Sequence, residues 1–231
     1  MSERPRPKKV NVTTKKPLIS VVVPVKNEAS HIIATLQSIA ENTYPNIEIV
    51  VIDDGSIDGS KALVTKYAAK LQTLKKSRIE RFGYITRKYD SPSHAIAAGI
   101  KHSGGEFVLV LPADVRLEKR AIENLHIRYS NADIKSVFTR PIYQETDKRS
   151  TICRILAAYD QPIVSFRRRA VDYDKLQTMP LRAFADSLQP VYAQNVIGYT
   201  DITFDVHDVL ARFSRARKKL SRAPTGLTHR A

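Results

Sequence analysis

Two short apolar runs, separated by a helical pattern, constrain the fold of this chain more than any other feature of its sequence. Residues 18–25 read LISVVVPV and residues 47–52 read IEIVVI. Nearly continuous apolar runs of this length are typical of strands that a parallel sheet buries on both faces. The segment between them, residues 30–42, carries apolar side chains at helical spacing, namely Ile32, Ile33, Leu36 and Ile39. The sequence therefore predicts a strand, a helix and a second, parallel strand, with Pro24 ending the first strand.

The same alternation continues to about residue 139. After residue 58, a helix is predicted on the apolar face formed by Leu63, Val64, Tyr67 and Leu71. Further strands are predicted at residues 79–85, 106–111 and 134–139, and further helices at residues 94–102 and 118–129. Beyond residue 140, helices are expected at residues 151–159, 170–177 and 181–189, and a last strand at residues 202–206. These elements predict one α/β domain with a mostly parallel central sheet flanked by helices.

Basic residues are concentrated at the two ends of the chain. The 231 residues carry a formal net charge of +15. We expect residues 1–17 to form a basic disordered arm, residues 18–206 the domain, and residues 207–231 a basic C-terminal helix or tail. A charge this far from neutral predicts an anionic partner: a phosphorylated small molecule, an anionic membrane surface or a nucleic acid.

Several classes of protein are disfavoured by the sequence. Apolar runs stay well short of the ~20 residues that span a bilayer, and the single Cys153 fits a reducing, cytoplasmic compartment. A dinucleotide-binding dehydrogenase is excluded because no G-x-G-x-x-G follows the first strand. A basic nucleic-acid-binding protein remains the rival from another class, although its usual motifs are absent and there is no tryptophan to stack on bases.

Polar side chains follow the predicted strands where these strands end, namely Asn27, Glu28, Asp53, Asp54, Asp114 and Arg140. Ligands of open parallel sheets bind beyond the carboxyl ends of the strands, so we expect one site there. A carboxylate at that edge can accept hydrogen bonds from a nucleoside or hold a divalent cation against a diphosphate. We interpret Asp53 and Asp54 as ligand-binding residues, and Ser56 and Asp58 as turn and helix-cap residues.

The segments around the first two strands read ISVVVPVKNE at residues 19–28 and IVVIDDGSIDGS at residues 49–60. Their residues and spacing resemble the opening of family 2 glycosyltransferases, which have the GT-A fold and transfer a sugar from a nucleotide diphosphate. The resemblance implies a Rossmann-like GT-A domain and an inverting transfer. It also implies that the nucleoside of a UDP- or GDP-sugar is bound by Pro24, Asn27, Glu28, Asp53 and Asp54.

Later segments are similar to the polyprenyl-phosphate branch of this family, which includes dolichyl-phosphate mannose synthase. They read GGEFVLVLPADVRL at residues 104–117, ADIKSVFTR at 132–140, QPIVSFRRRAV at 161–171 and ITFDVHDVLARFSRARKKL at 202–220. The similarity implies a lipid-phosphate or glycan acceptor, with Arg140 and Arg212 binding its phosphate and Arg167 as a further candidate. The basic tail is expected to lie on an anionic membrane surface, which implies a peripheral protein at the cytoplasmic face.

The D-x-D metal motif of the family reads Pro112-Ala113-Asp114 here, so one metal ligand is absent. Asp114 alone predicts a weak Mg²⁺ or Mn²⁺ site that donor phosphates and water would complete. Arg116 stands where the polyprenyl-phosphate branch has a metal-binding glutamine, and a guanidinium can pair with phosphate in place of a metal. Its plain alternative is a solvated residue at the start of a helix.

Two interpretations of this eroded motif stay open. In the first, the chain is a metal-independent enzyme in which Asp114 and Arg116 are catalytic. In the second, it binds nucleotide sugars without turnover. Asp114 is also the first candidate for a general base, ahead of the scattered side chains of His94, His102, His126, His207 and Asp205. An acceptor phosphate is already anionic and would need no base.

Overall fold

The computed structural model describes residues 16–73, 77–139, 142–143, 163–192 and 198–200. Seven strands form its central sheet: β1 (Ile19–Val25), β2 (Ile47–Asp53), β3 (Ile79–Thr86), β4 (Phe107–Val110), β6 (Ser136–Thr139), β8 (Ile163–Arg167) and β9 (Val191–Tyr192). Three short strands form a second sheet: β5 (Val115–Leu117), β7 (Ile142–Tyr143) and β10 (Gly198–Thr200). The helices are α1 (Ile32–Ala40), α2 (Ser60–Gln72), α3 (Pro92–His102), α4 (Ala121–Arg128), α6 (Tyr173–Thr178) and α7 (Leu181–Ser187).

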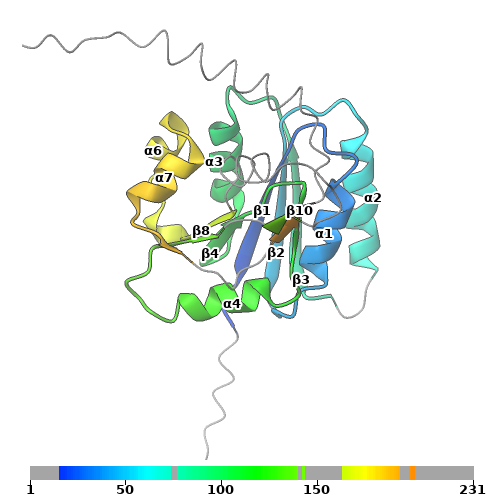
Figure 1. Ribbon diagram of the computed structural model, residues 1–231. Helices are drawn as coiled ribbons and strands as arrows, with labels where there is room; N and C mark the ends of the chain where they lie inside the picture. Colours follow the sequence, from blue (N-terminus) through cyan, green and yellow to red (C-terminus); the bar gives the residue numbers. More distant parts are fainter. Residues whose placement is uncertain (1–15, 74–76, 140–141, 144–162, 193–197, 201–231) are drawn as a thin grey trace, which may run out of the picture.

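The central sheet has the strand order β3-β2-β1-β4-β8-β6-β9. β3, β2, β1 and β4 are parallel to one another, and β9 is parallel to β6. β8 is antiparallel to both of its neighbours, β4 and β6. The sheet is therefore mostly parallel, as the sequence predicts, and the expected α/β architecture is confirmed (Figure 1).

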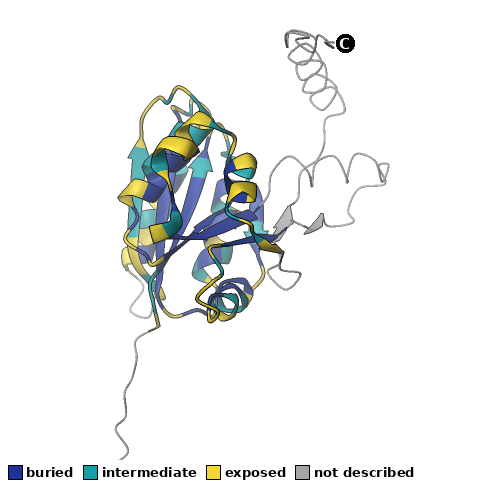
Figure 2. Ribbon diagram, turned by 90° about the vertical axis from the view of Figure 1, so that its left-hand side faces the viewer, coloured by how far each residue is buried: buried dark blue, intermediate teal, exposed yellow. Residues whose placement is uncertain are grey.

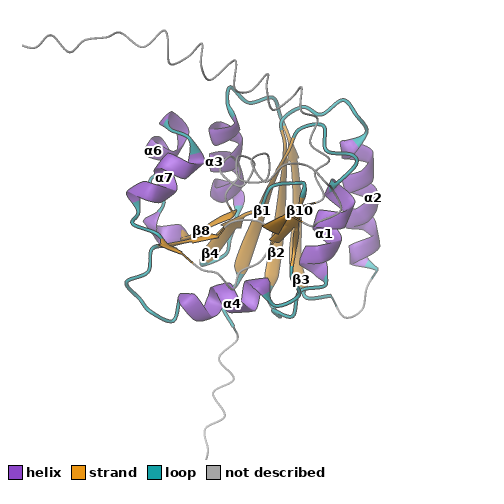
Figure 3. Cartoon of the chain, in the orientation of Figure 1, coloured by secondary structure: helices purple, strands orange, loops and turns teal. Residues whose placement is uncertain are grey.

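Helices cover both faces of the sheet (Figures 1 and 3). One face packs against α1, α2 and α4 in a core that includes Ile32, Leu36, Val64 and Leu125. The other face packs against α3, α6 and α7, whose core residues include Ile100, Leu176 and Phe184. Figure 2 shows the strands buried at the centre and the exposed residues on the outer sides of the helices. The nearly continuous apolar character of β1 and β2 follows from this burial on both faces.

Pro24 lies inside β1 instead of ending it, because its backbone nitrogen has no neighbouring strand to donate to. The carbonyl oxygen of Val22 accepts from the N–H of Leu111, on the β4 side. Pro24, two residues further on, faces the same side, where the pairing with β4 has already stopped at Val22. A missing N–H at this position removes no hydrogen bond from the ladder.

At the start of α2, Asp58 is a turn residue as expected, but the expectation that it caps the helix is wrong, because the N-cap is Gly59 and the helix has no side-chain cap hydrogen bond. Gly59 is the residue that precedes the helix, with a positive φ of 90°. Asp58 Oδ1 accepts from the backbone N–H of Ser60 at 3.1 Å and from its hydroxyl at 2.6 Å. These hydrogen bonds, led by the one from the Ser60 hydroxyl, lower the pKa of Asp58.

Some expected elements lie outside the described residues. These are most of the arm at residues 1–17, the helix at 151–159, the strand at 202–206 and the tail at 207–231. Within the part of the chain that the structure describes, no helix is long and apolar enough to cross a membrane.

Candidate functional site

The carboxyl ends of β1, β2 and β4 bring predicted site residues to one edge of the sheet, which we call the carboxyl edge. Val25 lies opposite Asp53 in the parallel register of β1 and β2. The N–H of Asp54 donates to the carbonyl oxygen of Val25 at 2.9 Å. β4 is parallel to β1 on its other side, so the chain leading to Asp114 leaves the sheet at the same edge. The convergence of these carboxylates is what the sequence predicts.

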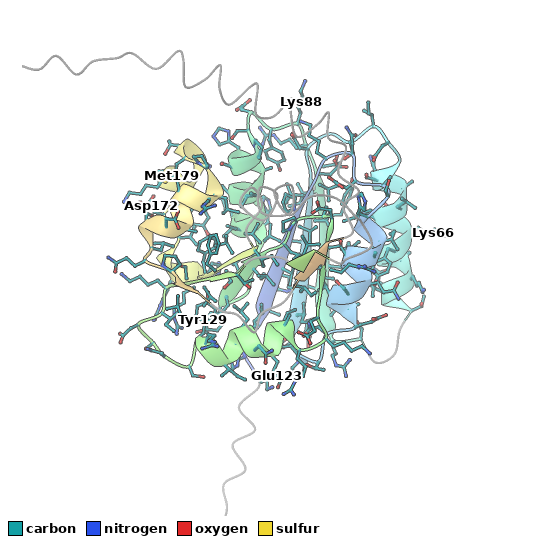
Figure 4. All side chains as sticks on the ribbon, in the orientation of Figure 1. Lys66, Lys88, Glu123, Tyr129, Asp172 and Met179 are labelled. Carbon is teal, nitrogen blue, oxygen red and sulfur yellow. The ribbon has the colours of Figure 1, made fainter. Side chains whose placement is uncertain are left out.

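The carboxyl edge and its opposite end can be followed in Figure 4. Lys88, just beyond β3, is labelled at the carboxyl edge, at the top of the view. Glu123 and Tyr129, on and just after α4, are labelled at the opposite end.

Asp53 is buried, with an exposed fraction of 1%, and both of its carboxylate oxygens are bound by neighbouring groups. Oδ1 accepts from the backbone N–H of Ser56 at 2.8 Å and from its hydroxyl at 2.7 Å. Oδ2 accepts from the hydroxyl of Tyr84 on β3. The turn between them includes Gly55, whose φ of 72° suits glycine. Asp53 therefore holds the loop after β2 in shape, and Ser56 is the turn residue that the sequence predicts.

Asp54 is also buried, but a more exposed partner binds one of its oxygens. Oδ1 accepts from the backbone N–H of Tyr89 at 2.7 Å. Oδ2 accepts from Nζ of Lys26 at 2.7 Å, and the Lys26 side chain is 64% exposed. Burial acts to raise the pKa of Asp54, but these two hydrogen bonds and the charges of Lys26 and Lys88 lower it below the ordinary value. Asp54 is thus held as a carboxylate.

Asn27 and Glu28 connect the loop after β1 to the loop after β2. Asn27 has a positive φ of 57°, and its side-chain oxygen accepts from the N–H of Ile57 at 2.9 Å. Its own N–H donates to the hydroxyl of Ser56 at 3.0 Å. The N–H of Glu28 donates to the hydroxyl of Ser60 at 3.0 Å. These hydrogen bonds of Asn27 therefore hold the two loops together.

The carboxylates of Glu28 and Asp114 are close enough to interact. Burial raises the pKa of Glu28, and the charge of Asp114 adds to that rise. His31 Nδ1 lies 3.2 Å from Glu28 Oε2 and opposes the shift. Asp114 is itself 9% exposed. The adjacent carbonyl oxygen of Ala113 accepts from the hydroxyl of Thr35 on α1 at 2.6 Å, which ties this loop to α1.

Arg116 is half-buried in β5, directly across from Tyr199 of β10 in an antiparallel pair. It belongs to a strand, so its interpretation as the solvated start of a helix is wrong; α4 begins only at Ala121. Its place two residues after Asp114 keeps it near the carboxyl edge. Arg140 and Arg212 lie outside the described residues.

Arg167 does not belong to this site, because it lies at the opposite end of the molecule. It ends β8 across from Phe107, the first residue of β4. Its guanidinium donates to the carbonyl oxygens of Ile134, Tyr129 and Asn131, at 2.8, 2.6 and 2.9 Å. The expectation that Arg167 is a further candidate for the acceptor phosphate is therefore wrong; its side chain holds three carbonyls instead.

Two of the histidine candidates for a general base are also displaced from the carboxyl edge. His102 ends α3, where its Nδ1 contacts the carbonyl oxygen of Ala98 at 2.7 Å. His126 lies on α4, and burial lowers the pKa of its imidazole. His94 lies near the start of α3, 3.8 Å from Asp90. His207 and Asp205 lie outside the described residues.

A metal at the carboxyl edge would have few protein ligands. The described ranges contain no group of three or more His, Cys, Asp or Glu residues arranged to hold an ion. Asp114 with Glu28 nearby matches the pattern of one or two carboxylates that Mg²⁺ uses when phosphates and water complete its shell. Pro112 adds no side-chain oxygen. The residues present therefore fit only an ion that arrives with, or is completed by, a phosphorylated ligand.

Sequence analysis did not identify three residues that contact the Asp pair: Lys26, Tyr84 and Tyr89. Tyr84 lies opposite Val51 in the register of β2 and β3, and this register cannot be read from the sequence. The signal for Lys26 was present, since a lysine directly after a buried strand lies at its carboxyl end.

Curated relatives match about half of this chain. The glycosyltransferase GlyG of Streptococcus pneumoniae serotype 4 is 29% identical over 119 residues, which make up 51% of this chain and 37% of GlyG. The poly(ribitol-phosphate) β-N-acetylglucosaminyltransferase TarS of Staphylococcus aureus is 33% identical over 107 residues, 46% of this chain and 18% of TarS. The chain thus spans well under half the length of either relative.

Solved structures share the fold at low sequence identity. The mannosyltransferase PcManGT from Pyrobaculum calidifontis, in complex with GDP-Man and Mn²⁺, aligns with a TM-score of 0.66 and 19% identity over 92% of this chain and 66% of that one. S. aureus TarS 1–349 in complex with UDP aligns with a TM-score of 0.59 and 16% identity over 80% and 60%. The sequence model of glycosyl transferase family 2 matches residues 20–180. The chain therefore belongs to glycosyl transferase family 2.

Proposed function

We propose that this protein transfers a sugar from a nucleoside diphosphate donor, a UDP- or GDP-sugar, to an acceptor. The observation that carries the proposal is the carboxyl edge of a family 2 domain, where Asp54 follows β2 and the carboxylates of Glu28 and Asp114 interact. The complexes of structural neighbours with UDP and with GDP-Man and Mn²⁺ support a donor of this class. Cytoplasmic location follows as part of the proposal, because such donors are expected there.

The nucleoside is proposed to bind over the ends of β1 and β2. Pro24, Asn27 and Glu28 supply one wall, and Asp53 and Asp54 supply the other. The contacts of Asp53 and Asn27 suggest that they act by shaping the loops. Asp54 and Glu28 are then the carboxylates that face the nucleoside, and hydrogen bonds to base or ribose would select it.

The transfer needs a positive charge where the diphosphate leaves. An oxygen of the acceptor attacks the anomeric carbon from the far side, the bond to the diphosphate breaks, and the configuration inverts. Arg116 is proposed to neutralise the departing diphosphate as a fixed cation. A Mg²⁺ or Mn²⁺ ion held by Asp114 would supply positive charge to the diphosphate as a Lewis acid when bound.

The metal question has a direct test. Turnover in excess chelator, lost on changing Arg116→Ala, would support a metal-independent site. Turnover that chelator abolishes and Mn²⁺ restores would assign the charge to an ion at Asp114. Unchanged turnover of the Arg116→Ala variant in chelator would reject Arg116 as the cation.

The acceptor is proposed to be a lipid phosphate at the cytoplasmic membrane surface, with Arg140 and Arg212 binding its phosphate. A phosphate oxygen is already an anion, so this acceptor requires no general base; for a hydroxyl acceptor, Asp114 would be the base. The basic tail would attract the protein to anionic lipid. Loss of liposome binding on deleting residues 210–231 tests the membrane part separately.

The deciding experiment measures release of UDP or GDP from sugar donors with and without polyprenyl monophosphate. Acceptor-dependent release supports an active enzyme. Binding of the donor without release, at any metal concentration, would favour the inactive protein that Pro112 suggests. Tight binding of duplex DNA that persists at moderate salt would favour the nucleic-acid rival instead.

A further inference from the structure

The four carboxylate oxygens of Asp53 and Asp54 are not equally available to a ligand. In the described part of the chain, Asp53 Oδ1 and Oδ2 are bound by Ser56 and Tyr84. Asp54 Oδ1 is bound by the main-chain N–H of Tyr89. A ligand can take the place of these hydrogen bonds only if a loop moves or the Tyr84 side chain on β3 moves. The fourth, Asp54 Oδ2, accepts instead from the long and exposed side chain of Lys26.

The bond between Lys26 and Asp54 is easy to exchange. An ion pair with one strongly exposed partner contributes little net free energy, because water and salt screen it. Lys26 is 64% exposed whereas the Asp54 side chain is 10% exposed. A buried carboxylate oxygen needs a replacement donor when the lysine leaves, whereas the ammonium can be solvated or find another anion.

We propose that Lys26 is a displaceable partner of Asp54: the base of the donor nucleotide takes its place at Asp54 Oδ2, and the freed ammonium pairs with the donor's phosphate. The inference rests on the proposed function. It means that Lys26 links binding of the base to binding of the phosphate, because the base frees the ammonium that then pairs with the phosphate. Uracil and guanine each present a ring N–H that can donate to a carboxylate oxygen. The diphosphate of the same ligand then supplies the anion that the lysine has lost.

This exchange predicts opposite effects of one substitution on two related ligands. A nucleoside without phosphate must displace Lys26 and leaves its ammonium with no new anion. A nucleoside diphosphate displaces it and pairs with it. Removing the lysine therefore helps the nucleoside and harms the diphosphate, whereas a lysine that merely orients Asp54 would affect both in the same direction.

The test measures dissociation constants of uridine and UDP, and of guanosine and GDP, by calorimetry and NMR titration. For Lys26→Met we expect about threefold tighter nucleoside binding, the scale of an exposed ion pair. We expect about tenfold weaker binding of the diphosphate, the scale of one charge-assisted contact. Lys26→Gln can still donate to Asp54 but carries no charge, so it should weaken only the diphosphate.

Two matched variants separate exchange from simple loss of charge. Lys88→Met removes a charge that acts on Asp54 without bonding to it, and should leave nucleoside binding unchanged. Lys66→Met, on α2 away from the carboxyl edge (Figure 4), should change neither ligand. If Lys26→Met shifts both ligands in one direction, or neither, the exchange is overturned while the donor site stands. If the wild-type protein binds no nucleotide at all, the proposed function fails instead.

Discussion

Arg167 donates to three main-chain carbonyl oxygens and is 7% exposed. Its guanidinium also lies over the rings of Phe107 and Tyr129, at 5.1 and 5.3 Å. Replacing it leaves buried carbonyls without donors, so Arg167→Met should lower the free energy of unfolding by about 3 kcal/mol. Urea denaturation checks this, with the exposed Arg169→Met as the control. Unchanged stability together with lost ligand binding would contradict the structural role.

The ionisation of Glu28 should make the stability of the protein depend on pH. Burial raises its pKa from the ordinary value of 4.5, so the folded protein holds this proton more tightly than the unfolded chain does. Stability linked to Glu28 is therefore present below pH 4.5 and is lost as the pH rises through the folded-state pKa. Glu28→Gln should remove that loss, making the variant more stable than the wild type near neutral pH.

Thermal unfolding of the Glu28→Gln variant from pH 4 to 8 checks this prediction. Glu41→Gln, an exposed change at the other end of α1, should follow the wild-type profile. If the variant is as stable as the wild type or less stable at neutral pH, folding does not disfavour the ionised form of Glu28.

At the scale of elements, α3 approaches the sheet so closely that it requires glycine. A Cβ at Gly99 would lie 2.6 Å from Val22 Cγ1 and 2.7 Å from Ile52 Cγ1. Because these neighbours belong to the packed core, Gly99→Ala should lower the free energy of unfolding by about 2 kcal/mol despite the higher helix propensity of alanine. Lys101→Ala, on the exposed side of the same helix, should change stability little. A stabilised Gly99→Ala variant would contradict the close packing.

The elements also show which parts of the fold can be predicted from sequence. β1 and β2 were identifiable because burial on both faces leaves an unusual apolar run. β8 was not predicted, because its partners β4 and β6 are distant in sequence and nothing in the run IVSFR shows an antiparallel neighbour. Arg167, the last residue of this strand, lies against the rings of Phe107 and Tyr129, which come from other parts of the chain.

For the whole molecule, the described residues place the candidate site carboxylates at one end of the sheet and the buried contacts of Arg167 at the other. The carboxyl edge holds Asp54, Glu28 and Asp114, and the opposite end holds Arg167 with its carbonyls. The topological rule for parallel sheets predicted the first group correctly. It could not predict which carboxylate oxygens already accept hydrogen bonds within the protein. Tyr84 on β3 and Tyr89 in the loop after β3 come next to the Asp pair only when β3 pairs with β2.

The carboxyl edge is proposed to bind the nucleotide of a sugar donor, and calorimetric titration with UDP and GDP measures that binding. Each titration would be run with and without Mn²⁺, on the wild type and on Asp54→Ala, after thermal unfolding confirms that both are folded. We predict saturable binding of one nucleotide by the wild type and its loss in Asp54→Ala. Absence of binding by the folded wild type, or equal binding by Asp54→Ala, would show that the carboxyl edge is not a nucleotide site.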